Sequence, residues 1–178
     1  RMAEALALRG IATLRYQFPY MERKARRPDP PGVATATVRA AVALAHRLAP
    51  ELALIAGGKS FGGRMTSTAQ GSDPLPDVRG LAFLGFPLHP PGKPAVTRGE
   101  HLDAVRIPML FLQGDRDEFA EPILLRQVLR GLGGRATLHL VHGGDHSFSV
   151  PKKSGRSPDD VFDELATTIA DWALNIPR

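Results

Sequence analysis

The sequence predicts an α/β fold, with a mostly parallel sheet covered by helices on both faces. Short apolar runs alternate with longer amphipathic ones, which is typical of strands joined by crossover helices. The apolar runs, such as LALIA and GLAFLGF, are nearly continuous, as expected for strands that are buried on both faces. A length of 178 residues fits a single domain.

The first part of the chain predicts two helices and two strands. Residues 2–9 predict a helix, because Gly10 fits the left-handed position that follows a last helical turn. Residues 11–18 predict a strand that ends at a proline. Residues 33–48 predict an amphipathic helix with one apolar stripe, and residues 52–56 predict a short buried strand.

The rest of the chain repeats this alternation. A helix at 61–70 follows a pair of glycines, and the apolar run at 78–86 predicts a strand. Four prolines make residues 87–94 a rigid loop. Ser157 before a proline fits the N-cap of a closing helix. The remaining elements are two strands, each followed by a helix: 109–113, 122–132, 136–141 and 158–174. The total is five strands.

Composition restricts the classes of function. Without cysteine, the chain has no disulfide, no thiolate metal site and no cysteine nucleophile. The formal net charge is +5, but the one dense basic run, at 23–27, adjoins prolines, and aromatic residues make up only 6%. We expect this run to be a solvated loop, and we expect no nucleic-acid partner. No apolar run reaches the ~18 residues that span a bilayer, and no export leader is evident, so we expect a cytoplasmic protein.

A candidate nucleophile lies between a predicted strand and a predicted helix. Gly58-Lys59-Ser60-Phe61-Gly62 fits the pattern G-x-S-x-G. In a tight strand-to-helix turn, small flanking residues leave the serine hydroxyl exposed at the carboxyl edge of the sheet. The amide of Phe61 would open the helix and donate to a developing oxyanion.

The same residues also resemble the end of a phosphate-binding loop, G-x-x-x-x-G-K-[ST]. That pattern requires glycine at position 53, where this chain has Ala53 inside the predicted strand. No loop is left to wrap a phosphate, so the sequence argues against a nucleotide triphosphatase.

A serine nucleophile needs a base, and the base needs an acid that orients it. Asp117 follows the predicted strand at 109–113, and His146 follows the strand at 136–141, so both lie at the carboxyl edge. Asp115 is the local alternative to Asp117 as the acid. His146 follows two glycines, which suits a base that must reach Ser60 from a loop.

Histidines and an aspartate near this base raise the hypothesis of a metal site: His139, His142, Asp145 and His146. On a strand, residues three apart face opposite sides, so His139 and His142 do not converge on one ion. We therefore expect no metal and no cofactor, and we expect His139 to be structural.

Four segments, in the order GGKSFGGRM, LGFPLHPPGKP, FLQGDRDEF and GGDHSF, resemble small bacterial α/β-hydrolase-fold proteins related to dienelactone hydrolases. Their wider group includes the KANL3/Tex30-like proteins. The resemblance runs from about residue 10 onward and implies an α/β-hydrolase fold without a large cap domain. It also implies that Ser60, Asp117 and His146 match the catalytic triad of the family.

The sequence departs from this group at its front. Members start with a strand and a His-Gly-Ala-Gly-like loop that supplies a second oxyanion donor, whereas we interpret this sequence as starting partway through the first helix. We therefore expect residues 1–178 to form a single α/β-hydrolase domain that lacks the N-terminal strand and the oxyanion loop. The loss of one such donor typically costs ~10² to 10³ in rate.

Two functions are consistent with these observations. The first is a serine hydrolase that cleaves a small-molecule ester or lactone through an acyl-enzyme. The second is a non-catalytic binding or scaffold protein on the same fold. In the loop at 87–94, His89 is either a substrate contact or, as we favour, a solvent-exposed residue.

Overall fold

The computed structural model describes residues 1–176, and its centre is a four-stranded parallel sheet. The strands are β1 (Leu54–Lys59), β2 (Val78–Leu84), β3 (Met109–Gly114) and β4 (Ala136–Val141), and they are adjacent in chain order. Leu54 lies opposite Val78 at the start of the β1–β2 pairing, and Gly114 lies opposite Val141 at the end of the β3–β4 pairing. Consecutive strands in one direction require crossovers, so all carboxyl ends meet at the same edge of the sheet.

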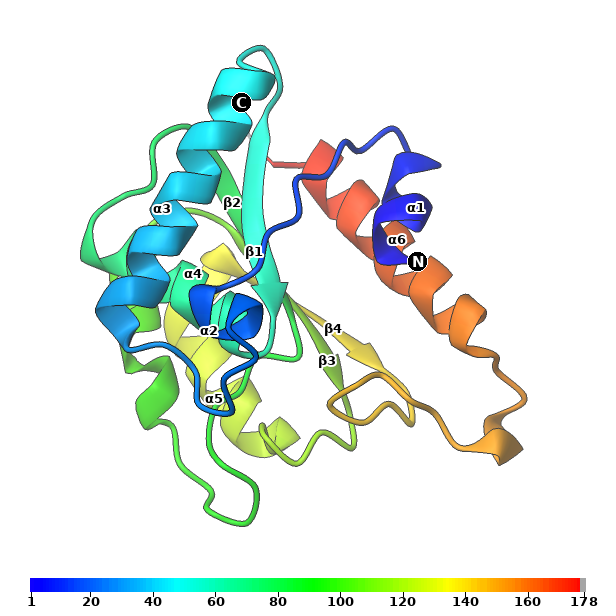
Figure 1. The fold of residues 1–178 in the computed structure, drawn as a ribbon. Coiled ribbons are helices and arrows are strands. Elements are labelled where there is room, and N and C mark those ends of the chain that lie inside the picture. Colours follow the sequence, from blue (N-terminus) through cyan, green and yellow to red (C-terminus); the bar gives the residue numbers. More distant parts are fainter. Residues whose placement is uncertain (177–178) are drawn as a thin grey trace.

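Helices cover both faces of the sheet, as predicted (Figure 1). On one face lie α3 (Pro31–Leu48), α4 (Phe61–Ser72) and α5 (Pro122–Leu132). On the other face lie α1 (Met2–Ala7) and α6 (Pro158–Leu174), which pack against each other. A short helix, α2 (Pro19–Glu22), precedes α3, and 3₁₀ segments lie in the loops at Thr97–Ala104, Gly133–Arg135 and Lys152–Ser154.

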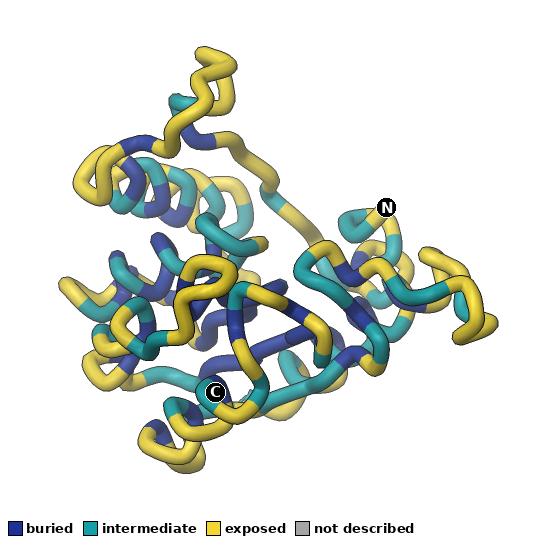
Figure 2. The backbone as a smooth tube through the Cα atoms, turned by 90° about the horizontal axis from the view of Figure 1, so that it is seen from below, coloured by how far each residue is buried: buried dark blue, intermediate teal, exposed yellow. Residues whose placement is uncertain are grey.

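The core consists of two layers that share the sheet. In β3, Met109 and Phe111 belong to the layer under α3, α4 and α5, whereas Leu110 and Leu112 belong to the layer under α6. This alternation is the two-residue period of a strand, and it explains why the whole run is apolar. Figure 2 shows the resulting buried centre with exposed loops around it.

The prediction of a strand at 11–18 is wrong. The segment forms no strand and pairs with none of the four strands. Its backbone hydrogen bonds join it to the neighbouring turns: Ile11 N–H donates to Leu6 O at 3.0 Å, and Phe18 O accepts from Met21 N–H at 2.9 Å. Strand propensity is a preference for a pleated, half-buried surface, so it produces a strand only where a neighbouring strand offers backbone partners. Here the sheet ends at β1.

The boundaries of the other elements agree with the prediction within a few residues. The main shift is in β1, which includes both glycines that were placed after it. A side chain at Gly57 would meet the backbone oxygen of Ala82 at 2.0 Å, so glycine allows β1 to continue beside β2. The closing helix starts as predicted, with Ser157 and Asp160 in a capping box.

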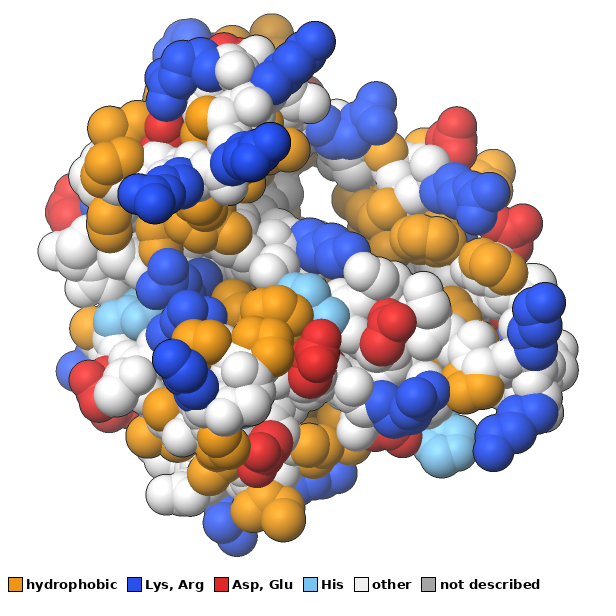
Figure 3. Space-filling model, turned by 60° about the horizontal axis from the view of Figure 1, so that its bottom comes forward, with side chains coloured by type: hydrophobic (Ala, Val, Ile, Leu, Met, Phe, Trp, Pro, Cys, Tyr) orange, Lys and Arg blue, Asp and Glu red, His pale blue; other side chains and the backbone are white. Residues whose placement is uncertain are grey.

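The basic run at 23–27 lies in an exposed loop, as expected. Arg23 forms an ion pair with the buried carboxylate of Asp29, at 2.7 Å. On the face shown in Figure 3, basic side chains are interrupted by acidic, hydrophobic and uncharged ones. Within residues 1–176, no helix has the length and apolar composition needed to cross a membrane.

Candidate active site

Ser60 occupies the sharp turn between β1 and α4. Its backbone has φ 50° and ψ −116°, a conformation that side-chain-bearing residues rarely adopt. The backbone N–H of Ser60 donates to the carbonyl oxygen of Leu84 at 3.0 Å, and the carbonyl oxygen of Ser60 accepts from Arg64 N–H at 3.1 Å. The turn is therefore fixed on one side to the end of β2 and on the other to the first turn of α4, and the strain is held in place by both elements.

Close backbone contact explains the glycines around Ser60. A Cβ on Gly58 would lie 3.1 Å from backbone atoms of Gly62 and Gly63, and a Cβ on Gly63 would lie 2.7 Å from the oxygen of Gly58. A Cβ on Gly62, by contrast, would meet only Phe18 Cε2, at an ordinary 3.6 Å. The sequence pattern indicated small residues at Gly58 and Gly62, but the structure shows that a side chain would be crowded by backbone atoms at Gly58 and Gly63 and would find room at Gly62.

The loop after β4 brings His146 to Ser60. Its Nδ1 lies 2.7 Å from Asp117 Oδ2, and its Nε2 lies 2.8 Å from Ser60 Oγ. An ionised carboxylate only accepts hydrogen bonds, so Nδ1–H donates to Asp117 and Nε2 is left to accept the serine proton. The ring lies against Phe119, with ring centroids 4.2 Å apart, and its side chain is only 18% exposed.

Asp117, rather than Asp115, is the acid that reaches His146. The side chain of Asp117 is fully buried, and it accepts hydrogen bonds from Phe119 N–H at 2.8 Å and from the side chain of Gln113. Asp115 instead accepts from His142 Nδ1 and Gly143 N–H, each at 2.8 Å. The structure thus separates the two aspartates that the sequence left as alternatives.

Sequence reasoning missed Gln113. It is the one polar side chain in the apolar run of β3, and it is fully buried. A buried side-chain amide requires hydrogen-bond partners, so a glutamine in an apolar strand indicates that polar groups lie beside it. Those partners are Asp117 and the N–H of Phe86.

Phe61 is the first residue of α4, as predicted. An amide at this position has no intrahelical acceptor, so it is available to an anionic oxygen near Ser60. The Phe61 ring packs edge-on against Phe18 and Tyr20, at centroid distances of 5.3 and 5.9 Å. This aromatic cluster holds the start of the helix beside the turn.

The expectation that His89 is solvent-exposed is wrong. The residue is 1% exposed, and Glu121 N–H donates to its Nε2 at 3.2 Å, so Nδ1–H donates to Pro90 O at 2.9 Å. Its backbone N–H also donates to Phe119 O at 3.0 Å. Because both ring nitrogens are engaged, His89 braces the loop that carries Asp117 and Phe119, and neither nitrogen is left for a substrate.

The histidines considered for a metal site bind separate carboxylates. His139 lies 2.6 Å from Glu164, which also pairs with Arg156, and His142 binds Asp115. Asp145 accepts from the backbone amides of its own loop. In residues 1–176 no three of these side-chain types are grouped to hold a metal ion.

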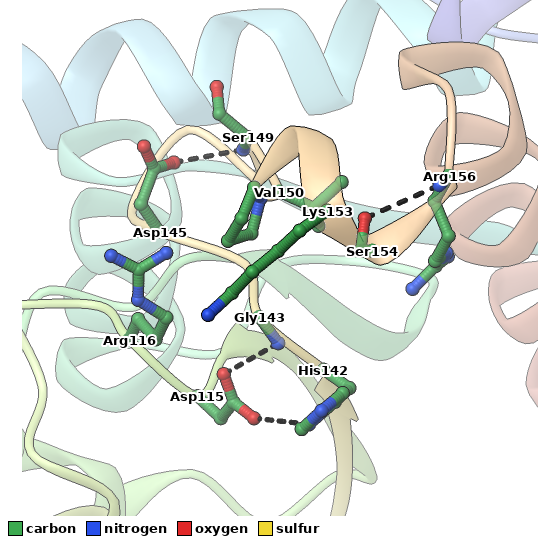
Figure 4. A pocket seen from close by; sticks show the side chains of 11 residues that line it. Asp115, Arg116, His142, Gly143, Asp145, Ser149, Val150, Lys153, Ser154 and Arg156 are labelled. Carbon is green, nitrogen blue, oxygen red and sulfur yellow. Dashed lines mark hydrogen bonds and ion pairs between the residues drawn. The ribbon is translucent and has the colours of Figure 1, made fainter.

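An open cavity of about 1290 Å³ lies between the loops that follow β3 and β4 and the segment at 149–156 (Figure 4). Its lining includes Asp115, Arg116, His142, Asp145 and Lys153, and none of Ser60, Asp117 or His146 contributes to it. The cavity is therefore separate from the contacts of Ser60.

Comparison with known proteins agrees with this architecture. A family model described as an alpha/beta hydrolase domain matches residues 1–174. A serine hydrolase without a lid from Xanthomonas campestris superposes with a TM-score of 0.72 at 23% identity, over 99% of this chain and 72% of that one.

Two further structures are similar. An esterase domain of a Rhodothermus marinus protein has a TM-score of 0.70 at 16% identity, over 97% of this chain and 78% of that one. A putative dienelactone hydrolase from Klebsiella pneumoniae has a TM-score of 0.62 at 16% identity, over 90% and 68%. At these identities the likeness concerns the fold.

Proposed function

The chain belongs to the α/β-hydrolase domain family, and from that premise we propose that it is a serine hydrolase that cleaves carboxylic esters or lactones through an acyl-enzyme. One observation carries the proposal: a single imidazole lies 2.8 Å from Ser60 Oγ and 2.7 Å from the buried carboxylate of Asp117. Ser60 also has the strained backbone that this role requires.

In the first half of the proposed reaction, Ser60 Oγ attacks the carbonyl carbon while His146 Nε2 takes the hydroxyl proton. Asp117 keeps Nδ1 protonated and stabilises the imidazolium that forms. The amide of Phe61 donates to the negative carbonyl oxygen. The bond between the carbonyl carbon and the alcohol oxygen then breaks, and His146 gives its proton to the leaving alcohol.

In the second half, a water molecule attacks the acyl-enzyme, His146 takes its proton, and Ser60 recovers that proton as the acid leaves. This reaction needs no metal and no cofactor, and its partner is a small-molecule substrate. Because no large cap domain covers this rim in residues 1–176, we propose small or extended esters rather than long buried acyl chains.

Within the family, we propose that the chain falls in the KANL3/Tex30-like group related to dienelactone hydrolases. The support is the order of the four segments around Ser60, the proline-rich loop, Asp117 and His146. The structure of the dienelactone-hydrolase-like protein from Klebsiella, similar in fold, is consistent with this grouping.

A fluorophosphonate probe tests the proposed function. We expect the wild-type protein to be labelled and Ser60→Ala to be unlabelled, because the probe needs an activated serine oxygen. Ser72→Ala, at the far end of α4, is the matched control and should label like the wild type. An unlabelled, folded wild-type protein that also turns over no p-nitrophenyl ester would refute the hydrolase and favour a scaffold role.

A further inference from the structure

The side chain of Gln113 connects two elements of the site. Its Oε1 accepts from Phe86 N–H at 2.9 Å, and its Nε2 donates to Asp117 Oδ2. A backbone N–H only donates, so the amide oxygen must face Phe86 and the NH₂ group must face Asp117. The orientation of this amide is therefore determined by its surroundings.

Gln113 binds the same oxygen of Asp117 that His146 binds. Oδ2 accepts from both side chains, while Oδ1 accepts from Phe119 N–H. The Asp117 side chain is fully buried, so water does not replace a lost donor without rearrangement. Three donors from different segments fix the plane of the carboxylate, and this plane sets the direction in which Nδ1–H must point.

The oxygen of the Gln113 amide is bound by a segment that also lies against the imidazole of His146. Gly85, beside Phe86, has φ +68°, and a Cβ there would lie 3.4 Å from Nδ1 and Cε1 of His146. The segment at the end of β2 thus lies against the imidazole of His146. It also anchors the side-chain amide of Gln113, which in turn binds Asp117. The hydrogen bonds form one chain from Phe86 through Gln113, Asp117 and His146 to Ser60.

We propose that Gln113 is a positioning residue that fixes Asp117 relative to His146. The inference rests on the proposed hydrolase function. Gln113 has no exposed surface, so it acts through Asp117 and does not touch substrate. Its role is to keep the imidazole aimed at Ser60 during proton transfer, where small displacements are costly.

Two charged residues adjacent in sequence to Ser60 and His146 are engaged elsewhere. Lys59 Nζ lies 3.4 Å from Ser147 Oγ, and Asp145 accepts from the amides of Ser147 and Ser149. Asp117 is therefore the carboxylate that contacts His146, and a change beside Asp117 is transmitted to the ring directly.

The first test replaces Gln113 by methionine, which keeps the length of the side chain and removes the donor. We expect kcat to fall ~10- to 100-fold, as for partners that orient reactive groups, with KM within about twofold of wild type. The NMR signal of the proton between His146 Nδ1 and Asp117 should shift or disappear. Leu112→Met, on the opposite face of β3, is the control and should change neither.

The second test replaces Gln113 by glutamate, which donates to Asp117 only while it is protonated. Two adjacent buried carboxylates cannot both ionise without repulsion. We therefore expect the ratio of kcat for Gln113→Glu to kcat for wild type to fall at least about tenfold as pH rises from about 6 to 9. A purely structural role predicts a ratio that does not change with pH.

The outcomes are separable. If Gln113→Met keeps wild-type kcat and the same NMR signal, the positioning role is wrong. If that variant does not fold, a pH-independent ratio for Gln113→Glu overturns the role and a falling ratio supports it. If wild-type protein shows no labelling and no turnover, the proposed function fails, and the NMR comparison still decides whether Gln113 controls the His146–Asp117 hydrogen bond.

Discussion

The close contact between α4 and β1 gives a prediction about Gly63. In Gly63→Ala, the new Cβ would lie 2.7 Å from Gly58 O and 3.2 Å from Phe83 Cδ1. To reach an ordinary contact of about 3.4 Å, α4 must retreat from β1 by about 0.7 Å at the point where Ser60 is held. The neighbour that must move is backbone, so side-chain rotation does not relieve the clash.

Two effects on stability oppose each other. Alanine is about 1 kcal/mol more favourable than glycine inside a helix. Overpacking a tight contact costs about 1–3 kcal/mol, so we expect Gly63→Ala to be neutral to about 2 kcal/mol less stable than wild type. Activity should suffer more, because displacement of a reactive group by about 1 Å costs ~10²-fold, so labelling of Ser60 should slow by about 10- to 100-fold.

Gly62→Ala is the matched control, since it makes the same change one residue earlier in the same helix. Its Cβ meets only Phe18 Cε2 at 3.6 Å, so this variant should be at least as stable as wild type and label at a similar rate. Urea unfolding and the rate of fluorophosphonate labelling measure both quantities. If Gly63→Ala matched Gly62→Ala in both, the close approach of α4 to Gly58 would not be what holds Ser60.

Two further predictions concern titratable groups. Asp117→Asn should lower kcat by ~10³ to 10⁴, since an amide no longer keeps Nδ1 protonated, whereas Asp115→Asn should change kcat only a few-fold; steady-state kinetics with a p-nitrophenyl ester distinguishes the two. Burial, and then the nearby Arg64, lower the pKa of His101 below its ordinary value of 6.5. The contribution of neutral His101 to stability is therefore present above pH 6.5 and is lost as pH falls through the folded-state pKa. We expect His101→Gln to lose less stability than wild type on acidification, measured by urea unfolding at about pH 7.5 and 5.5. An equal loss in the two proteins would contradict this reasoning.

Some features followed from short stretches of sequence. Strands β3 and β4 and helices α5 and α6 matched their predicted ranges within one residue, because continuous apolar runs and capping residues specify them locally. The positions of Ser60, Asp117 and His146 just beyond strand ends followed from the same patterns, since parallel strands place their carboxyl ends at one edge. The structure brings these three side chains into hydrogen-bond contact.

Other features depended on what lies next to a segment in space. Residues 11–18 have strand propensity but no adjacent strand. His89 was expected to be solvent-exposed, but it is buried in its loop, where Glu121 N–H donates to it. The choice between Asp115 and Asp117 was likewise open, because two residues of sequence separation cannot tell which carboxylate turns toward the imidazole.

Sequence alone thus determined the order of the four sheet strands and of the helices α3 to α6 around them, the turn at Ser60 and the edge of the sheet where polar residues gather, because local propensity and periodicity encode them. Tertiary structure decided which acid binds His146, that a side chain is excluded at Gly63 rather than at Gly62, and that Gln113 donates to Asp117. Those choices depend on how closely packed groups approach one another, to within a few tenths of an ångström, and no local pattern specifies such distances.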